Sequence, residues 1–592
     1  MRSGKKLTLG ILPTFLCLLS MLIVACGGGG SNGDNGNGSK PQKAADNKQV
    51  YVDPAAVPGL SDIKTFDPAL DSDLYSANAI NMVFTGLIEL DNNLNITPEL
   101  AQSYSVGSDG KTYTFKLKPN LQFSDGTPLT SKDVAYSIDR ALQPATKSGV
   151  AGTYLNLVKD SDKLNAGKIK TIIGDSITTP DDNTIVIVTT KKAAYFLDAL
   201  TYQDAYVVEK KLIDQYGTRF TDHLGDGSGG GSGPFMVKKY TRGQEIDFVP
   251  NPHYYGNKPQ LKEVIFPFYK SLDTMYKAYQ TGAVDNTGVP SAQLATAKQL
   301  TNEFRNTPQL SISYYTMNYL VKPFDNIKVR QAFALALNKD QIVHSIYKDS
   351  QIATNHIVPK GMPGYDANLK GPDGTTSTAG NPTKAKQLFT EGLQEDGMTV
   401  ASLGTVSVYV SSAGSADLRN EFAAEQQMWQ SALGITIKFV DEDFNKLLSD
   451  TTNATNNPKG IGIWGLGWGA DYPDAQDFTT LQFDNGSPQN NLNYGQNNSA
   501  TSAAQKTVQQ QLEAADANVT DPNGRIQQYN TLEQQLVNDV AWLPEFQQAS
   551  QRLTKPCVVG AVITANTQVY PSAWANVYIS SDPNCANATV HP

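Results

Sequence analysis

The sequence predicts a mixed α/β protein with several lobes, from its length, its composition and its alternation of strand and helix patterns. The chain has 592 residues, of which 40% are hydrophobic and 9% aromatic. That length favours several domains or one multi-lobed body, and the composition can fill a large packed core. Segments with the two-residue period of a strand alternate irregularly with segments that carry one apolar helical face.

The first 25 residues have the pattern of an export signal. Three basic residues precede an almost wholly apolar stretch, Leu7–Val24, as in a signal peptide. The stretch ends in Ile-Val-Ala-Cys, which resembles a bacterial lipobox with Cys26 as the acylated residue. An ordinary signal peptide or a single membrane anchor is the alternative. Residues 26–50 begin with a glycine-rich run and are expected to form a flexible tether.

Charge and histidine content argue against several classes of protein. The formal net charge is −9, and it falls to −12 without the three basic residues of the signal. Such an acidic chain lacks the basic surface that binds nucleic acid or anionic lipid. Only five histidines are present, which argues against a metal site built from histidine.

Cys557 and Cys585 are the cysteines that remain in the mature body, because Cys17 lies in the signal and Cys26 at the proposed lipid site. An even pair in an exported chain predicts a disulfide, and two buried free thiols are the alternative. No CxxC motif or Cys/His cluster indicates a structural zinc site.

Several segments in the first half of the chain have strand patterns. Residues 112–118 alternate between apolar and polar side chains, and the Gly-Ser-Asp-Gly turn before them predicts a hairpin with residues 104–106. The glycine-rich segment 225–233 is expected to be a flexible surface loop. Further strands are expected at residues 184–190, 237–240 and 245–249, of which the last two should pair.

Helical patterns occur throughout the chain and dominate its second half. Residues 79–84 are expected to be helical and to stop at Gly86. Asn338 followed by Gln341 predicts a capping box at the start of a helix. Near the end, Asp521 can cap a helix that has proline at its first position.

Six segments, in order, resemble the family 5 extracellular solute-binding proteins, the peptide- and nickel-binding class. They run from about residue 60 to the C-terminus. They are FDPAL (66–70) with TGLIEL (85–90), the run from TPELAQSY to DRAL (97–142), GPFMVKKY (233–240) with NPHYYGNKP (251–259), PFDNIKVRQAFALALNKDQIV (323–343), WGADYPDAQDF (468–478) and RIQQYNTLEQQLVNDVAWLPEF (525–546).

This resemblance implies two α/β lobes around a cleft, joined by hinges near residues 312 and 544, with an extra domain on the first lobe. It also implies a monomeric, lipid-anchored protein on the extracellular face of the bacterial cytoplasmic membrane. Such a protein would pass peptides to ABC permease subunits, with no cofactor and no enzymatic activity. The expected ranges are 51–95, 205–312 and 544–592 for lobe I, 96–204 for the extra domain and 313–543 for lobe II.

The Trp-Gly-Ala-Asp-Tyr-Pro motif is the strongest candidate for ligand contact. Its aspartate, Asp471, follows an apolar strand-like run and precedes Pro473, so it should lie at a strand exit. A partly buried carboxylate needs a cation, and a peptide α-ammonium can supply one. In the family's peptide-binding members the matching Asp holds that amine and the Trp walls the pocket, which implies these roles for Asp471 and Trp468. A surface turn capped by the aspartate is the alternative.

A second candidate segment follows Asp67-Pro68. In the oligopeptide binders it lies along the ligand backbone, where main-chain pairing would tolerate many sequences. An ordinary solvent loop is the alternative. The resemblance maps this role onto Ser72, Asp73, Leu74 and Tyr75. Tyr154 and Tyr494 are weaker candidates, because most of the 27 tyrosines must be structural.

Other motifs do not indicate a catalytic or nucleotide site. Residues 460–465 match GxGxxG, but glycines and a proline follow where a dinucleotide site needs a helix. We find neither a nucleophile elbow nor a carboxylate pair marked for acid–base chemistry. Two functional alternatives stay open: a non-peptide ligand such as a nickel chelate, haem or an oligosaccharide, and a surface lipoprotein that senses peptides.

Overall fold

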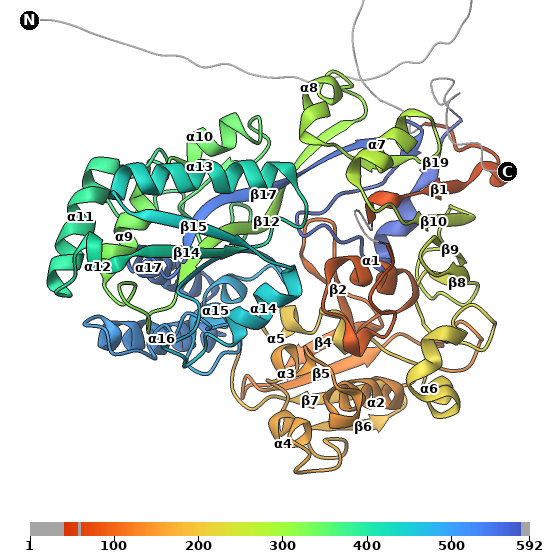
Figure 1. Cartoon of the computed structure of the whole chain (residues 1–592). Coiled ribbons are helices and arrows are strands. Elements are labelled where there is room, and N and C mark those ends of the chain that lie inside the picture. The colour runs from red at the N-terminus through yellow and green to blue at the C-terminus, as the bar shows by residue number, and fades with distance from the viewer. Residues whose placement is uncertain (1–40, 57–60, 582–592) are drawn as a thin grey trace, which may run out of the picture. The chain divides into compact units, whose positions relative to one another are not determined.

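The computed structural model describes residues 41–56 and 61–581, and from residue 42 onward these described residues form one compact unit. Cys26, Cys585, the signal and most of the tether therefore lie outside the described residues. Three larger sheets organise the described part (Figure 1). None of its helices combines the length and the hydropathy needed to cross a bilayer.

The first sheet has four strands in the order β1-β10-β9-β8. β1 is parallel to β10, and the other pairs are antiparallel. Helix α1 (Leu74–Val83) packs against this part of the molecule, with its residues from Ser76 onward buried. The strands are β1 (Val50–Val52), β8 (Phe235–Thr241), β9 (Glu245–Pro250) and β10 (Glu263–Pro267).

The second sheet is antiparallel and has the order β4-β5-β7-β6. Helix α2 (Ser131–Leu142) presents Val134 and Ile138 to the same core as Phe115 of β5 and Ile187 of β7. The strands are β4 (Ala101–Val106), β5 (Thr112–Leu117), β6 (Ile177–Asp181) and β7 (Thr184–Val188).

The third sheet is mixed and has the order β11-β17-β12-β16-β14-β15, with β13 added on β17. Tyr314 and Tyr315 on β12 point to opposite faces, as strand geometry requires, and enter different cores. The strands are β11 (Asn286–Gly288), β12 (Phe304–Met317), β13 (Ile352–Ala353), β14 (Thr405–Val410), β15 (Thr436–Asp441), β16 (Ile463–Gly469) and β17 (Leu543–Thr554).

Helices cover both faces of this third sheet (Figure 1). The core on one face includes residues of α9 (Ile327–Ala336), α11 (Pro382–Glu395) and α13 (Ala416–Leu433). The core on the other includes residues of α16 (Ser502–Asp516) and α17 (Pro522–Asn538).

Shorter elements connect these layers. They are β2 (Ile88–Leu90), β3 (Ile96–Pro98), α3 (Ala151–Tyr154), α4 (Ser161–Asn165), α5 (Phe196–Ala199), α6 (Lys210–Tyr216), α7 (Leu272–Gln280), α8 (Leu294–Ala297), α10 (Lys339–Ser345), α12 (Val400–Leu403), α14 (Phe444–Thr452), α15 (Thr480–Phe483), β18 (Val558–Val559) and β19 (Tyr578–Ile579).

Most of the local predictions are confirmed. The first predicted hairpin is β4–β5, and the predicted strand pair is β8–β9. Asp521 caps α17 by accepting the Gly524 amide. Asn338 caps α10 by accepting the Gln341 amide, but the predicted capping box is incomplete, because the Asn338 amide donates to Met428 Sδ rather than to the Gln341 side chain. The start of α1 was predicted wrongly, because the helix begins at Leu74, where Asp73 caps it.

The glycine-rich segment 225–233 was only partly predicted. Its second half, from Gly229, is buried rather than a surface loop. A Cβ atom at Gly231 would lie 1.9 Å from the Val83 carbonyl oxygen, and one at Gly233 would lie 2.6 Å from the Val83 carbonyl carbon. These glycines therefore allow the chain to approach the end of α1 closely.

Candidate functional site

Asp471 lies two residues beyond the end of β16, at the strand exit that the sequence predicts. Its carboxylate accepts a hydrogen bond from the Tyr154 hydroxyl, and its amide donates to Asp477 Oδ2 at 3.2 Å. The first contact joins segments 317 residues apart. It unites two residues that the sequence analysis nominated separately.

Tyrosine rings surround this contact. Tyr154 stacks on Tyr202 with ring centroids 4.0 Å apart and meets Tyr472 edge to face. The Tyr202 hydroxyl lies 3.5 Å from the Asp71 carbonyl oxygen, at the limit of a hydrogen bond. The site therefore assembles from four separate stretches of the chain.

Buried carboxylates gather around these tyrosines. Asp71 and Asp204 are each 1% exposed, and Asp477 is fully buried. Neither oxygen of Asp204 has a hydrogen-bond partner, and one oxygen each of Asp71 and Asp477 also lacks one. Within the described residues, none of these three, nor Asp471, takes part in an ion pair. Buried polar groups normally have partners, so this is an unusual arrangement.

The electrostatics of the group follow from burial without a counter-charge. Burial raises the pKa of Asp471 to about 7, although the Tyr154 hydrogen bond opposes that rise. Burial, followed by repulsion from neighbouring aspartates that include Asp471, raises the pKa of Asp71 and of Asp204 well above the usual range. An arriving cation would stabilise the ionised carboxylates, so the group suits a ligand with a positive charge.

Trp468 is positioned by the same acid that orients the Asp471 backbone. Its indole Nε1 donates to Asp477 Oδ2 at 3.2 Å, the oxygen that also accepts the Asp471 amide. The ring is only partly buried, so one side of it can contact a ligand. Asp477 thus holds the two nominated residues in a fixed relation.

The second predicted segment has a different geometry from the one expected. Ser72 is exposed and accepts from Lys64 Nζ at 2.8 Å, while the Asp73 carboxylate caps α1 through the Tyr75 and Ser76 amides. Leu74 and Tyr75 form the first turn of α1. Leu74 and Tyr75 are therefore helical rather than extended, and the predicted contact of all four residues with a ligand stays a prediction.

Tyr494 and Cys557 lie in hydrophobic cores. Tyr494 is fully buried, and its hydroxyl donates to Asp539 Oδ2 at 2.9 Å. No hydrogen bond or ring contact joins it to the Asp471 group among the described residues. Cys557 is also buried, and its predicted partner Cys585 lies outside the described residues.

Four residues of this group, Asp71, Tyr202, Asp204 and Asp477, are not predicted from the sequence. Asp71 directly precedes the nominated segment, and Asp477 belongs to the WGADYPDAQDF segment, so proximity to a motif was an available signal. Tyr202 and Asp204 stand in no motif that was singled out. Only the fold brings them to Asp471.

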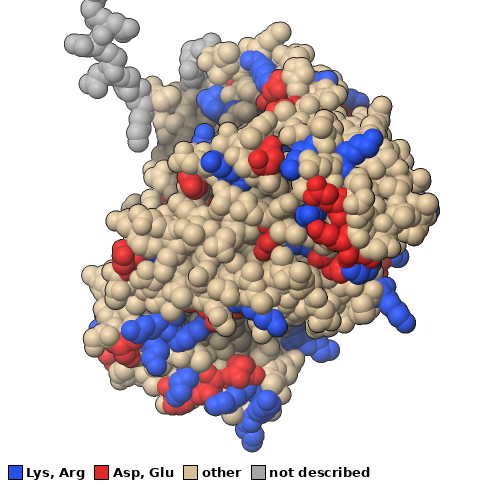
Figure 2. Space-filling view, turned by 90° about the vertical axis from the view of Figure 1, so that its left-hand side faces the viewer, with Lys and Arg blue, Asp and Glu red and all other residues tan. Residues whose placement is uncertain are grey.

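Charged side chains of both signs lie on the face of the molecule that Figure 2 draws, and they are interspersed there. No continuous basic field of the kind that binds a phosphate backbone is seen there.

The sequence matches one family profile and many known proteins. The profile described as "Bacterial extracellular solute-binding proteins, family 5 Middle" matches residues 95–490. The oligopeptide-binding protein OppA of Bacillus subtilis is 25% identical over 477 residues, which cover 79% of this chain and 83% of that protein. A dipeptide-binding protein of Lactococcus lactis is 28% identical over 494 residues, covering 79% and 82%.

Solved structures show the same fold. The Haemophilus influenzae OppA complex with RPPGFSPFR superposes with a TM-score of 0.72 at 23% identity, covering 90% of this chain and 100% of that one. Listeria monocytogenes OppA bound to peptide gives 0.69 at 22% identity, covering 90% and 99%. The predicted two-lobed α/β fold class is thereby confirmed.

Proposed function

This chain belongs to the bacterial extracellular solute-binding proteins of family 5, and on that premise we propose that it captures peptides for an ABC importer. The family consists of substrate-binding transport proteins, so the chain is not an enzyme. Relatives of both oligopeptide- and dipeptide-binding type support a peptide ligand here.

One observation carries the proposal: Asp471 is a carboxylate without a cationic partner among the described residues, beside an aromatic wall. A peptide α-ammonium would fill this position with a charge-assisted hydrogen bond. Tyr154 would hold the second carboxylate oxygen, and Trp468 would flank the first residue of the peptide. Ser72 and Asp73 would face the ligand from the other side of the cleft, and we leave Tyr494 out of this set.

Capture would proceed by closure of two lobes with the boundaries expected from the resemblance. The proposed hinges near 312 and 544 fall on β12 and β17. The pairing of these strands shifts register between Pro308 and Ile312 and again at Ser313–Tyr314. Such irregularities leave fewer ladder bonds to oppose bending. A ligand that contacts both lobes would favour the closed state.

The mature protein would be tethered to the outer face of the membrane through Cys26. A Cys26→Ser variant should lose lipid labelling and leave the membrane fraction, and retention at the parent level would contradict this. A disulfide between Cys557 and Cys585 also remains a proposal. Peptide mapping without reductant should recover the two cysteines in one linked fragment.

A double-mutant cycle tests the amine site. Asp471→Asn should weaken peptide binding by about 2–5 kcal/mol, since it removes the charge and keeps the shape. N-acetylation of the peptide should cost the parent protein a similar amount. Acetylation should cost the variant much less, because the pair is already broken.

Calorimetric titration of both proteins with free and acetylated peptide measures this coupling. Equal acetylation penalties in the parent and the variant would remove Asp471 from the amine site. Mass spectrometry of ligand that co-purifies with the protein tests the class of ligand independently, and a nickel chelate, haem or an oligosaccharide there would replace peptides.

A further inference from the structure

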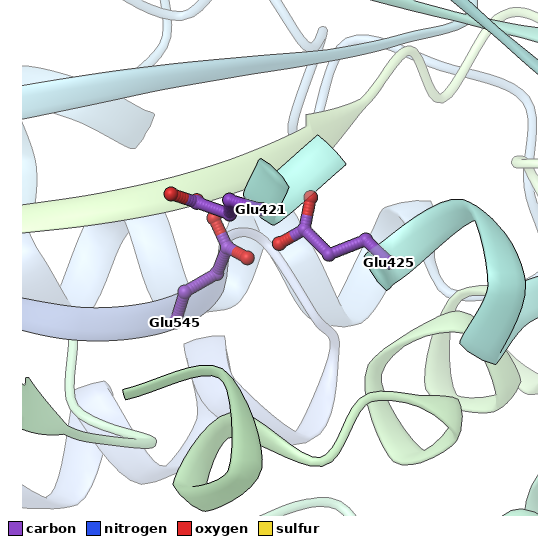
Figure 3. Close-up of side chains that lie close together, drawn as sticks. All are labelled: Glu421, Glu425 and Glu545. Carbon is purple, nitrogen blue, oxygen red and sulfur yellow. The ribbon is translucent and has the colours of Figure 1, made fainter. Parts of the chain in front are cut away.

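Three glutamates far from the WGADYP motif bring their carboxylates together inside the protein. Glu421 and Glu425 lie on α13, and Glu545 lies on β17. One oxygen from each lies within 4.8 Å of the other two. Figure 3 shows the three side chains converging from the helix and the strand.

The cluster is almost completely removed from water. Glu421, Glu425 and Glu545 are 2%, 0% and 3% exposed. Glu421 and Glu425 are four residues apart, so one helix face carries both toward β17. Like charges at this spacing already repel on an exposed helix, and burial increases the cost. Hydrophobic side chains would pack here at lower cost, so the three acids need a compensating interaction.

The protein supplies only part of that compensation. The Tyr347 hydroxyl donates to Glu421, and the Tyr315 hydroxyl donates to Glu425 Oε2 at 2.5 Å. Glu425 Oε1 and Glu545 Oε1 are buried and have no hydrogen-bond partner. Glu425 comes from helix α13 and Glu545 from strand β17, so the two unpartnered oxygens belong to different elements (Figure 3).

One buried cation lies near the cluster, and its hydrogen bonds go elsewhere. Lys339 Nζ donates to the Thr354 carbonyl at 2.9 Å and to Asn355 Oδ1 at 2.6 Å. Its ammonium attracts Glu545 through space without bonding to it. Burial lowers the pKa of Lys339 to about 7, so near neutral pH this lysine offsets at most one of three ionised carboxylates. A divalent cation would offset the remaining negative charge.

We propose that Glu421, Glu425 and Glu545 bind one divalent cation of the Ca²⁺ type, which fastens α13 to β17. Carboxylate oxygens are the ligands that hard cations prefer. Two oxygens on one ion lie at most twice the metal–oxygen distance apart, about 4.6–5.2 Å for Ca²⁺ and about 4.0–4.2 Å for Mg²⁺. The three oxygens lie within 4.8 Å of one another, close enough to share one ion, and Ca²⁺ tolerates irregular ligand geometry better than Mg²⁺ does.

The rival explanation is a cluster neutralised by protons alone, with Glu425 and Glu545 sharing one. Burial raises the pKa of all three glutamates, and mutual repulsion adds to it for Glu421 and Glu425. Protons and a metal ion therefore compete for the same oxygens. The two explanations differ in whether the stability of the protein depends on metal.

The experiment uses the mature chain without peptide, so it stands apart from the peptide-binding proposal. The protein is stripped with EDTA, and denaturant unfolding is followed with and without Ca²⁺, together with metal analysis of the untreated protein. We expect one bound ion per chain. We also expect the unfolding equilibrium to shift toward the native state by about 100-fold at a Ca²⁺ concentration 100 times the dissociation constant.

Glu425→Gln is the diagnostic variant, and Glu533→Gln is its matched control. Glu533 is an equally buried glutamate outside the cluster, whose Oε1 accepts the Ile357 and Val358 amides, as a glutamine oxygen can. In EDTA, Glu425→Gln should be at least as stable as the parent, because repulsion is relieved. It should lose the response to Ca²⁺, which Glu533→Gln should keep.

Several outcomes would overturn the proposal. They are an absence of bound metal together with identical unfolding in EDTA and Ca²⁺, or a Ca²⁺ response that survives in Glu425→Gln. A response to Mn²⁺ or Mg²⁺ but not Ca²⁺ would overturn the assignment of ion size. If Glu425→Gln does not fold, Glu545→Gln repeats the comparison, and the metal content of the parent decides by itself.

Discussion

Asp471 and Asp474 stand three residues apart in one loop, yet the fold treats their charges differently. The Arg525 guanidinium donates to both oxygens of Asp474, at 2.6 and 2.7 Å, and both side chains are largely buried. Asp471 receives only the Tyr154 hydroxyl and has no cationic partner among the described residues. The charge of Asp474 is thus neutralised within the protein, whereas that of Asp471 can be neutralised only by a proton or by a ligand.

The same contrast recurs at the other segment of the site. Arg140 binds Asp67 through both terminal nitrogens, while Asp71, four residues later, is buried with an unpartnered oxygen. Each segment therefore has one acid that fixes the fold and one that stays open. Burial alone therefore does not distinguish the two kinds of acid; the presence or absence of a counter-charge does, and the amine site proposed above rests on its absence at Asp471.

Breaking the closed pair should have the largest effect. Arg525→Ala should destabilise the protein by about 3–5 kcal/mol, because the buried Asp474 carboxylate loses its cationic partner and keeps only the Gln476 amide. Denaturant unfolding measures the loss. The control is Lys132→Ala at the exposed Lys132–Asp182 pair, which should cost about 0–1 kcal/mol. Equal losses in the two variants would show that the Arg525 pair is no more structural than a surface pair.

Lowering the pH below 7 should reduce the affinity of the protein for a peptide amine at Asp471. The pKa of Asp471 is about 7 in the free protein, so at lower pH an incoming ammonium must displace a proton. Affinity should fall about tenfold per unit below pH 7, or about 30-fold by pH 5.5, and should fall again above about pH 8 as the peptide amine deprotonates. Titration across this range in buffers of different ionisation enthalpy measures both the affinity and the proton release.

Other ionisable groups face Asp471, and their effect on the pH dependence of binding must be distinguished from that of Asp471. They are Tyr154, Tyr202, Tyr472, Asp71, Asp204 and Asp477. In Asp471→Asn the rise in affinity between pH 5.5 and 7 should disappear. If the variant keeps that rise, a neighbouring acid rather than Asp471 binds the amine.

Replacing the open acid should affect stability in the opposite sense to breaking the closed pair. The folded-state pKa of Asp471 is raised, so the stability that it contributes is complete below the unfolded pKa and lost as pH rises through about 7. Asp471→Asn should therefore make the ligand-free protein more stable at pH 8 by about 3–4 kcal/mol, with little difference at pH 4. Unfolding curves at both pH values test this, and a loss of stability at pH 8 would assign Asp471 a structural role.

What the sequence could predict depended on the range of the interactions. The hairpin β4–β5, the caps at Asn338 and Asp521, and the strand exit at Asp471 depend on neighbouring residues. The contacts of Asp471 with Tyr154 and of Arg525 with Asp474 join segments far apart, and only tertiary packing creates them.

Two wrong predictions, the start of α1 and the flexibility of the glycine-rich segment, have local causes in the sequence. The glutamate cluster, which was not predicted, has none. Helix α1 begins at Leu74, before the predicted start at residue 79, because Asp73 caps it. Aspartate is a preferred N-cap residue, so the sequence itself offered this signal. Glycines 229–233 were interpreted as flexible, although close approach to a backbone carbonyl also requires glycine. The pair Glu421–Glu425 gave no signal, because glutamates four apart on a helix usually face solvent.

The smallest expected effect comes from Tyr154, whose hydroxyl donates the hydrogen bond that the Asp471 carboxylate accepts. It tests most directly how Asp471 differs from Asp474. Tyr154→Phe removes the hydroxyl and keeps the ring that stacks on Tyr202. A hydrogen bond to a carboxylate favours its ionised form, so its loss should raise the pKa of Asp471 further. Peptide affinity at pH 7.5 should fall about 3- to 10-fold, and the rise in affinity with pH should move to higher pH. Tyr113→Phe is the control, since that buried tyrosine donates to the neutral Ala193 carbonyl. If Tyr154 is only structural, its replacement should change stability without shifting the pH profile of binding. That result would contradict a role for the Tyr154–Asp471 hydrogen bond in ligand binding.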